Sequence, residues 1–179
     1  MANYALLSAI GKDRPGIVAA VSAVLFEAGC NIEDSTMARL GGDFAIMLML
    51  RLPAGFTSQQ LAQRLTETQR RLQLTVNVTD IPPEEVEPQA ESARYLILVY
   101  GSDKPGIVAK LTSLLAERNV NITNLRTSVI QRAQPLYVMT VEVELPSFID
   151  QGELTKPLQA AAKELGVQVE IKPKPDARF

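Results

Sequence analysis

Two aspartates occupy the same short pattern at two places in the chain. Residues 11–16 read Gly-Lys-Asp-Arg-Pro-Gly around Asp13, and residues 101–106 read Gly-Ser-Asp-Lys-Pro-Gly around Asp103. An apolar pattern of helical spacing follows each copy, so each predicts the start of a helix. The proline then lies in the first helical turn, where an N–H has no intrahelical partner. We expect each aspartate to cap its helix or to lie just before the cap.

The chemistry available at such a turn is the binding of a small charged ligand. The start of a helix presents free backbone N–H groups and the positive end of the dipole, which suit a carboxylate. Gly16 and Gly106 allow close approach of a ligand or of neighbouring backbone. Asp13 and Asp103 would repel a nearby carboxylate but could accept a hydrogen bond from an ammonium group. The same residues can equally be structural, because aspartate before Pro-Gly is an ordinary helix start.

A second landmark follows each predicted helix at the same distance from the turn. It is Asn31-Ile32 in the first copy and Asn121-Ile122 in the second. The asparagine side chain carries both a donor and an acceptor, so Asn31 and Asn121 could bind a polar ligand. Asparagine is also a common turn former, and both readings stay open.

Little else in the chain could support catalysis. The sequence contains no histidine, which removes Ser-His and Cys-His pairs, histidine bases and the common zinc sites. The single cysteine, Cys30, excludes an intrachain disulfide, and its counterpart Val120 favours a buried apolar role over a reactive thiol. We therefore expect no enzyme activity, no metal and no cofactor.

Charge and hydropathy restrict the partners. The net charge is −2 and the pI is about 5.3, whereas a protein that binds phosphates usually has a basic face. Direct binding of nucleic acid is therefore not expected. No apolar run approaches ~20 residues, so we expect no membrane span. The N-terminus lacks the basic start of a signal peptide, which favours a cytoplasmic location.

The elements that position the two turns follow the same order in each copy. In the first copy, a buried strand precedes the turn, and the helix after it ends at Gly29. Gly41-Gly42 indicates a hairpin, and Thr57 with Gln60 indicates the capping box of a second helix. The expected strands are residues 3–10, 31–40, 43–52 and 74–79. Strand 43–52 is almost continuously apolar, which predicts burial on both faces or one face against a partner.

The second copy repeats the order strand, helix, strand, strand, helix, strand. The expected strands are residues 94–100, 120–131, 136–145 and 167–171, with a loop at 146–152 before a helix over 154–165. This order predicts an α+β protein with two ferredoxin-like βαββαβ domains. Each domain has an antiparallel four-stranded sheet with two helices on one face. The predicted domains are residues 1–80 and 94–179, the latter ending in a tail, and residues 81–93 form an acidic, proline-containing linker.

The repeated Gly-x-Asp-x-Pro-Gly-Ile-Val turn, the helix and Asn-Ile together resemble the ACT domain, a small regulatory module with this element order. Two such domains without an enzyme resemble the family of glycine cleavage system transcriptional repressors. Some amino-acid-binding ACT domains carry a polar side chain where this chain has Gly11 and Gly101, and asparagine where it has Asp13 and Asp103. The resemblance implies a ligand site at interfaces between domains. It implies Asp13, Asn31, Asp103 and Asn121 for this site. The predicted ligand-binding set also includes the glycines of the two turns, Gly11, Gly16, Gly101 and Gly106.

The function implied by this resemblance is regulation without catalysis. The protein would bind a small amino acid, with glycine as the first candidate, and act through a protein partner such as a transcription factor. We expect a homodimer. The alternative is a module for protein–protein interaction or assembly that needs no ligand, built on the open sheet faces and the apolar strand 43–52.

Overall fold

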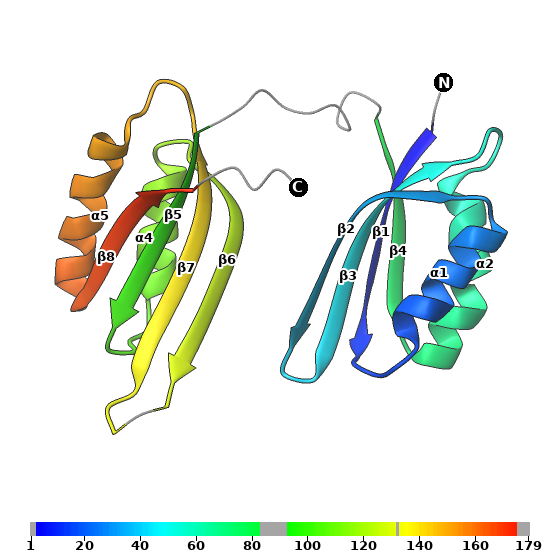
Figure 1. Ribbon diagram of the computed structural model, residues 1–179, viewed down its shortest axis with the longest axis horizontal. Helices are drawn as coiled ribbons and strands as arrows, with labels where there is room; N and C mark the ends of the chain where they lie inside the picture. Colours follow the sequence, from blue (N-terminus) through cyan, green and yellow to red (C-terminus); the bar gives the residue numbers. More distant parts are fainter. Residues whose placement is uncertain (1–2, 83–92, 132, 175–179) are drawn as a thin grey trace. The chain divides into compact units, whose positions relative to one another are not determined.

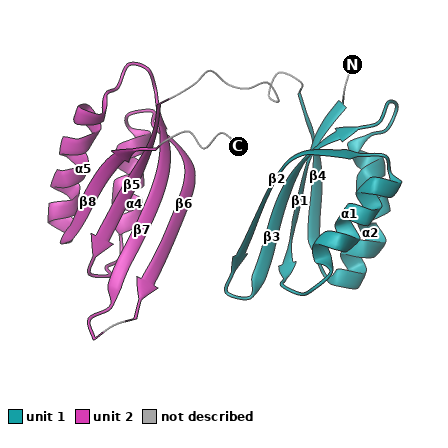
Figure 2. Ribbon diagram, in the orientation of Figure 1, with its two compact units in different colours: residues 1–88 teal, residues 89–179 magenta. Residues whose placement is uncertain are grey.

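The computed structural model describes residues 3–82, 93–131 and 133–174. The chain divides into two compact units, residues 1–88 and 89–179 (Figure 2). The expected acidic linker over residues 81–93 lies mostly outside the described residues. Its two ends belong to strands, because Ile81 closes one strand and Ala93 opens the next. The tail beyond Lys174 also lies outside the described residues.

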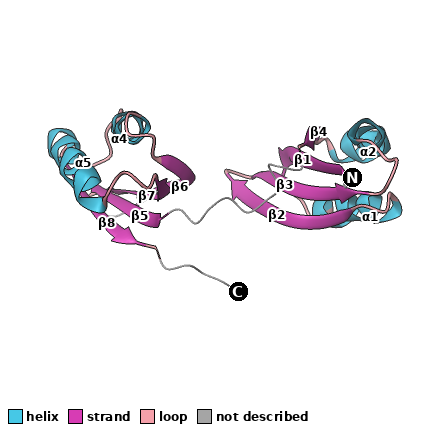
Figure 3. Cartoon of the chain, turned by 90° about the horizontal axis from the view of Figure 1, so that it is seen from above, coloured by secondary structure: helices cyan, strands magenta, loops and turns pink. Residues whose placement is uncertain are grey.

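The first unit has the order strand, helix, strand, strand, helix, strand (Figure 1). Its elements are β1 (Asn3–Lys12), α1 (Ile17–Glu27), β2 (Asn31–Leu40), β3 (Asp43–Leu52), α2 (Ser58–Leu72) and β4 (Thr75–Ile81). The strands form one antiparallel sheet in the order β2-β3-β1-β4. Both helices cover the same face of this sheet, and the other face is open (Figure 3).

The second unit repeats this architecture. Its elements are β5 (Ala93–Gly101), α4 (Ile107–Ala116), β6 (Asn121–Ile130), β7 (Leu136–Leu145), α5 (Gln151–Leu165) and β8 (Val167–Pro173). The antiparallel sheet has the order β6-β7-β5-β8. The prediction of an α+β protein with two ferredoxin-like βαββαβ repeats is therefore confirmed.

Each core lies between the helices and one face of the sheet. In the first unit, Ile17, Val21 and Leu25 of α1 and Leu61 and Leu65 of α2 are buried against alternate residues of the strands. Strand β3 alternates too, with Leu48 and its same-face neighbours buried and Met47 48% exposed on the other face. The prediction of burial on both faces of this strand is therefore wrong within the unit, because only the α1–α2 layer covers it.

Capping residues set the helix limits where the sequence carries them. The Thr57–Gln60 capping box at α2 is confirmed, with the Gln60 N–H donating to the Thr57 hydroxyl at 3.2 Å. Helix α5 starts earlier than expected, at Gln151, because the Asp150 carboxylate accepts from the Glu153 N–H at 2.9 Å. Most of the expected loop over residues 146–152 remains a loop, and only its last two residues join the helix.

The edge strand β2 has two irregular features. Gly41 and Gly42 connect it to β3 with φ angles of +60° and +87°, as the predicted two-residue hairpin requires. A β-bulge interrupts the pairing of β2 with β3 between Ile32 and Asp34. The second unit has its own bulge in the matching place, between Ile122 and Asn124. Both sheets therefore share one pairing register, which lets positions of the two repeats be compared one by one.

Candidate functional site

The turn before α1 does not have the predicted cap. The helix begins at Ile17, so Pro15 lies before it and not in its first turn. Gly16 is the N-cap residue, with φ +92° and no side-chain hydrogen bond to the helix. Gly106 takes the same place before α4, with φ +94°. The prediction that Asp13 and Asp103 cap the helices, or stand next to the cap, is wrong, because two residues separate each from a glycine N-cap.

Asp13 is instead held by the β2–β3 hairpin. Its N–H donates to the Gly42 carbonyl at 3.0 Å. Its carboxylate accepts from the Arg39 guanidinium at 3.2 Å, and the Arg39 side chain is 72% exposed. The cation of Arg39 compensates the negative charge that would otherwise repel a ligand carboxylate at this turn. Arg39 was missed in the sequence, although a two-residue turn at Gly41-Gly42 already places it opposite Phe44.

Asp103 has different surroundings in the second repeat. Val129 stands at the position matching Arg39, opposite Tyr137 in the β6–β7 ladder. Within the described residues Asp103 forms no ion pair. Burial raises the pKa of the Tyr137 hydroxyl, and the charge of Asp103 raises it further. The Tyr137 hydroxyl is buried and has no hydrogen-bond partner among the described residues. The two aspartates therefore lie in electrostatically different sites.

Gly11 and Gly101 are explained by packing. A Cβ atom on Gly11 would lie 2.7 Å from Leu74 Cδ2 and 3.0 Å from the Gln73 carbonyl oxygen. A Cβ atom on Gly101 would lie 2.9 Å from Val167 Cα. In both repeats the strand before the turn therefore touches the backbone that enters the last strand.

Gly16 and Gly106 are required for another reason. A Cβ atom on either would meet nothing within 4 Å, so space is available around both. Their left-handed backbone is what favours glycine at these positions. The first turns of α1 and α4 contain no acidic residue, so no side chain in them neutralises the positive end of the helix dipole.

Asn31 and Asn121 lie at the opposite end of their repeats from the aspartates. Asn31 opens β2, while Arg39, which contacts Asp13, lies near its other end. At about 3.3 Å per residue the two positions are roughly 25 Å apart. Asn31 donates to the Glu33 carboxylate at 2.9 Å, and Asn121 donates to Glu144 at 3.5 Å. One repeat therefore does not bring its aspartate and its asparagine to a single small ligand.

Cys30 packs against the first core and is partly buried. Burial raises the pKa of its thiol, and the nearby charge of Arg64 lowers it by less. A cation therefore lies near the thiol, yet the thiol is still less ionised than that of a free cysteine. This supports the apolar role over the reactive one.

Residues 3–82, 93–131 and 133–174 contain no group of three or more Cys, Asp or Glu side chains arranged to hold a metal ion. None of the helices in these ranges is both long enough and apolar enough to span a membrane.

Comparison with known proteins assigns the repeat. The profile of the ACT domain matches residues 3–79 and again residues 94–172. The chain belongs to the ACT domain family. Each matched range spans one βαββαβ unit, so the protein is a tandem of two ACT domains.

Similar proteins match either nearly the whole chain or less than half of it. The glycine cleavage system transcriptional repressor of Escherichia coli is 29% identical over 174 residues, which is 94% of this chain and 89% of the repressor. A UPF0237 protein of Methanopyrus kandleri is 40% identical over 77 residues, 42% of this chain and 82% of that protein. The crystal structure of an unknown protein from Galdieria sulphuraria matches with a TM-score of 0.83 and 27% identity, covering 98% of this chain and 100% of that one.

Proposed function

We propose that this tandem ACT protein is a non-enzymatic regulator that binds a small amino acid and acts through a protein partner. The observation that carries the proposal is the similarity to the E. coli repressor across both repeats. Glycine is the first candidate ligand, because that relative is named for the glycine cleavage system. A transcription factor is the first candidate partner, since the net charge of −2 disfavours direct DNA binding. A cytoplasmic location and a homodimer are parts of the same proposal.

The proposed ligand contacts are revised by the geometry. Asp13 and Asp103 are free of any capping role, so each can accept from a ligand ammonium group. Gly16 and Gly106 leave open space at the helix start, whereas Gly11 and Gly101 would contribute backbone only. Asn31 and Asn121 would contact the same ligand only where a second copy of the chain brings them near an aspartate turn. A regulator of this kind changes its domain arrangement because the ligand binds one arrangement more tightly than the other.

Calorimetry on the full chain tests this function. We expect millimolar glycine or another small amino acid to release or absorb heat on binding, and Asp13→Asn or Asp103→Asn to weaken the affinity of the repeat that carries it. Unchanged affinity in both variants would remove the aspartates from the site. No binding heat with any small amino acid would rule out the sensing function.

A ligand-independent assembly module is the second candidate. It is favoured by the open face of the first sheet, where Leu6, Met47 and Met49 line a shallow apolar depression. Light scattering separates the two candidates, because an assembly module keeps one oligomeric state with and without amino acid.

A further inference from the structure

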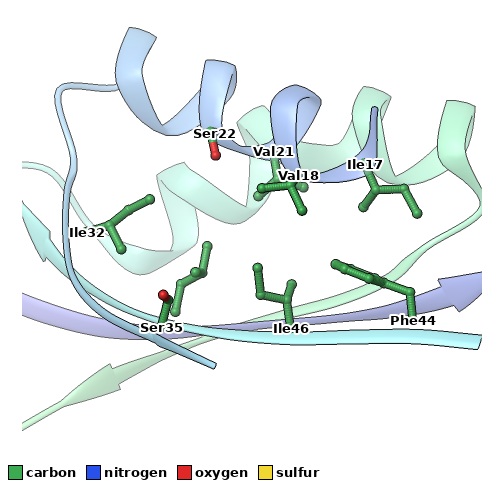
Figure 4. A pocket seen from close by; sticks show the side chains of 9 residues that line it. Ile17, Val18, Val21, Ser22, Ile32, Ser35, Phe44 and Ile46 are labelled. Atoms are coloured by element: carbon green, nitrogen blue, oxygen red, sulfur yellow. The ribbon is translucent and has the colours of Figure 1, made fainter. Parts of the chain in front are cut away.

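An apolar groove runs along α1 on the side of the edge strand β2 (Figure 4). Ile17 and Val18 of α1 and Phe44 of β3 line one part of it. Ser22, Ile32 and Ser35 line the other part, and both serine hydroxyls lie there (Figure 4). Its volume is about 120 Å³. An apolar cavity of about 150 Å³ in another protein stays dry and binds benzene, so this groove has the size of an aliphatic side chain.

The groove exists because α1 leaves the edge strand uncovered. Every residue of β2 is exposed, and Ser35 is too small to fill the space between the strand and the helix. Val18 is 44% exposed and Ile32 is 41% exposed. An aliphatic group placed in the groove would remove this apolar surface from water, which favours binding.

The second repeat carries larger side chains at the matching positions. The shared pairing register equates Ser35 with Leu125, because Ser35 lies opposite Leu48 and Leu125 lies opposite Val141. It equates Phe44 with the larger Tyr137 in the same way. On the helix, Leu111 takes the place of Val21. The smaller side chains of the first repeat therefore leave more space beside the helix than their counterparts do, and the groove described above lies in that repeat.

Charged groups stand at the Phe44 end of the groove. Arg39 lies opposite Phe44 in the β2–β3 ladder and on the same face of β2 as Ser35. Its guanidinium pairs with Asp13. A guanidinium has five donors and a carboxylate has about four acceptor positions, so this pair retains capacity for a ligand carboxylate and a ligand ammonium group. Val129 replaces Arg39 in the second repeat, so the matching position there has no such cation.

We propose that the first repeat binds an amino acid with an aliphatic side chain of valine to leucine size. The side chain lies in the α1–β2 groove, the ammonium group meets Asp13, and the carboxylate meets Arg39. This inference rests on the proposed function, because it uses the same Asp13 turn. It adds a preferred ligand class and assigns the site to one of the two repeats.

Calorimetry of the full chain with glycine, alanine, valine and leucine is the test. Affinity should rise roughly fourfold for each buried CH₂ group, so valine should bind more than tenfold tighter than glycine. Glycine binding as tightly as valine would overturn the groove proposal and leave amino-acid sensing intact. No binding by any of the four would contradict the proposed function itself.

Two reciprocal substitutions at matching positions of the repeats supply the controlled comparison. Ser35→Leu gives the first repeat the residue of the second and should reduce valine affinity at least tenfold while glycine affinity changes little. Leu125→Ser changes the matching position of the second repeat and should leave valine affinity unchanged. Circular dichroism and a thermal melt establish that both variants fold, and position 35 is exposed, so the leucine there does not enter the core. Full valine affinity in a folded Ser35→Leu protein would overturn the proposal.

Discussion

At the residue scale, the two strand-end glycines should differ in their tolerance of a methyl group. Gly101→Ala places Cβ against the backbone of Val167, which is less able to move, so we expect a loss of about 2–3 kcal/mol. Gly11→Ala first meets a terminal methyl group of the Leu74 side chain, which can shift more easily than backbone, so we expect a smaller loss of about 1 kcal/mol. Urea unfolding of both variants measures the difference. Equal losses would show that the two turns pack alike.

The buried hydroxyl of Tyr137 should be a cost to the second repeat. It has no partner among the described residues, and the first repeat carries Phe44 at this position. We expect Tyr137→Phe to raise the free energy of unfolding by about 1 kcal/mol. Thermal melting checks this result, with Tyr4→Phe on a half-buried strand position as the control. A loss of stability on removing the hydroxyl would instead show that it has a partner in solution.

The same residue should give a pH dependence at the alkaline end. The folded pKa of Tyr137 is raised, so ionisation is harder in the folded state than in the unfolded state. The resulting stability contribution is present below the unfolded pKa of about 10 and is lost as pH rises through the folded pKa. The wild type should therefore lose stability relative to Tyr137→Phe above pH 10, and the difference between the two proteins should stay constant below pH 9.

At the element scale, the helix starts show where sequence reading stops. The capping box of α2 was predictable because its two polar side chains reach local backbone. The α1 start was placed two residues early because Asp13 and Pro15 suit a helix N-terminus by type. The hairpin contacts through Gly42 and Arg39 hold the aspartate elsewhere, and these tertiary contacts have no local signature.

Helix α5 carries a proline inside its span. Pro157 has no N–H to donate to the preceding turn, which weakens the helix. We expect Pro157→Ala to raise the free energy of unfolding by about 1–3 kcal/mol. Gln159→Ala on the same helix should change it by less than about 0.5 kcal/mol. An unchanged stability would mean that the loss of proline raises the conformational entropy of the unfolded chain enough to offset the gain in the helix.

At the scale of the whole molecule, each repeat has its own core. Residues 1–88 form one compact unit whose buried cluster draws on both of its helices and its sheet. We expect a fragment of residues 1–88 to fold alone and to melt cooperatively. Circular dichroism and hydrogen exchange measure this. A fragment that is unfolded or aggregated would show that the first repeat depends on the second.

The duplicated architecture was predictable because motif, element order and apolar periodicity agree over both halves of the chain. The difference between the repeats was not predictable, because it depends on pairs of residues that lie far apart in the sequence and meet only in the folded sheet. Ser35 against Leu125 and Arg39 against Val129 become comparable once the bulges and hairpins fix the register. The sequence shows which residues repeat, and the ladder shows which substitutions matter.

The bulges that β2 and β6 each carry at matching positions also bear on aggregation. Each of these strands lies at the edge of its sheet and leaves one row of backbone donors and acceptors unpaired within its sheet. Such a row can recruit another chain into an extended, amyloid-like ladder. A bulge bends and twists the strand, so a flat strand from another molecule cannot pair along its full length. The bulge thus hinders uncontrolled pairing with other chains at the β2 edge of the first sheet and at the β6 edge of the second.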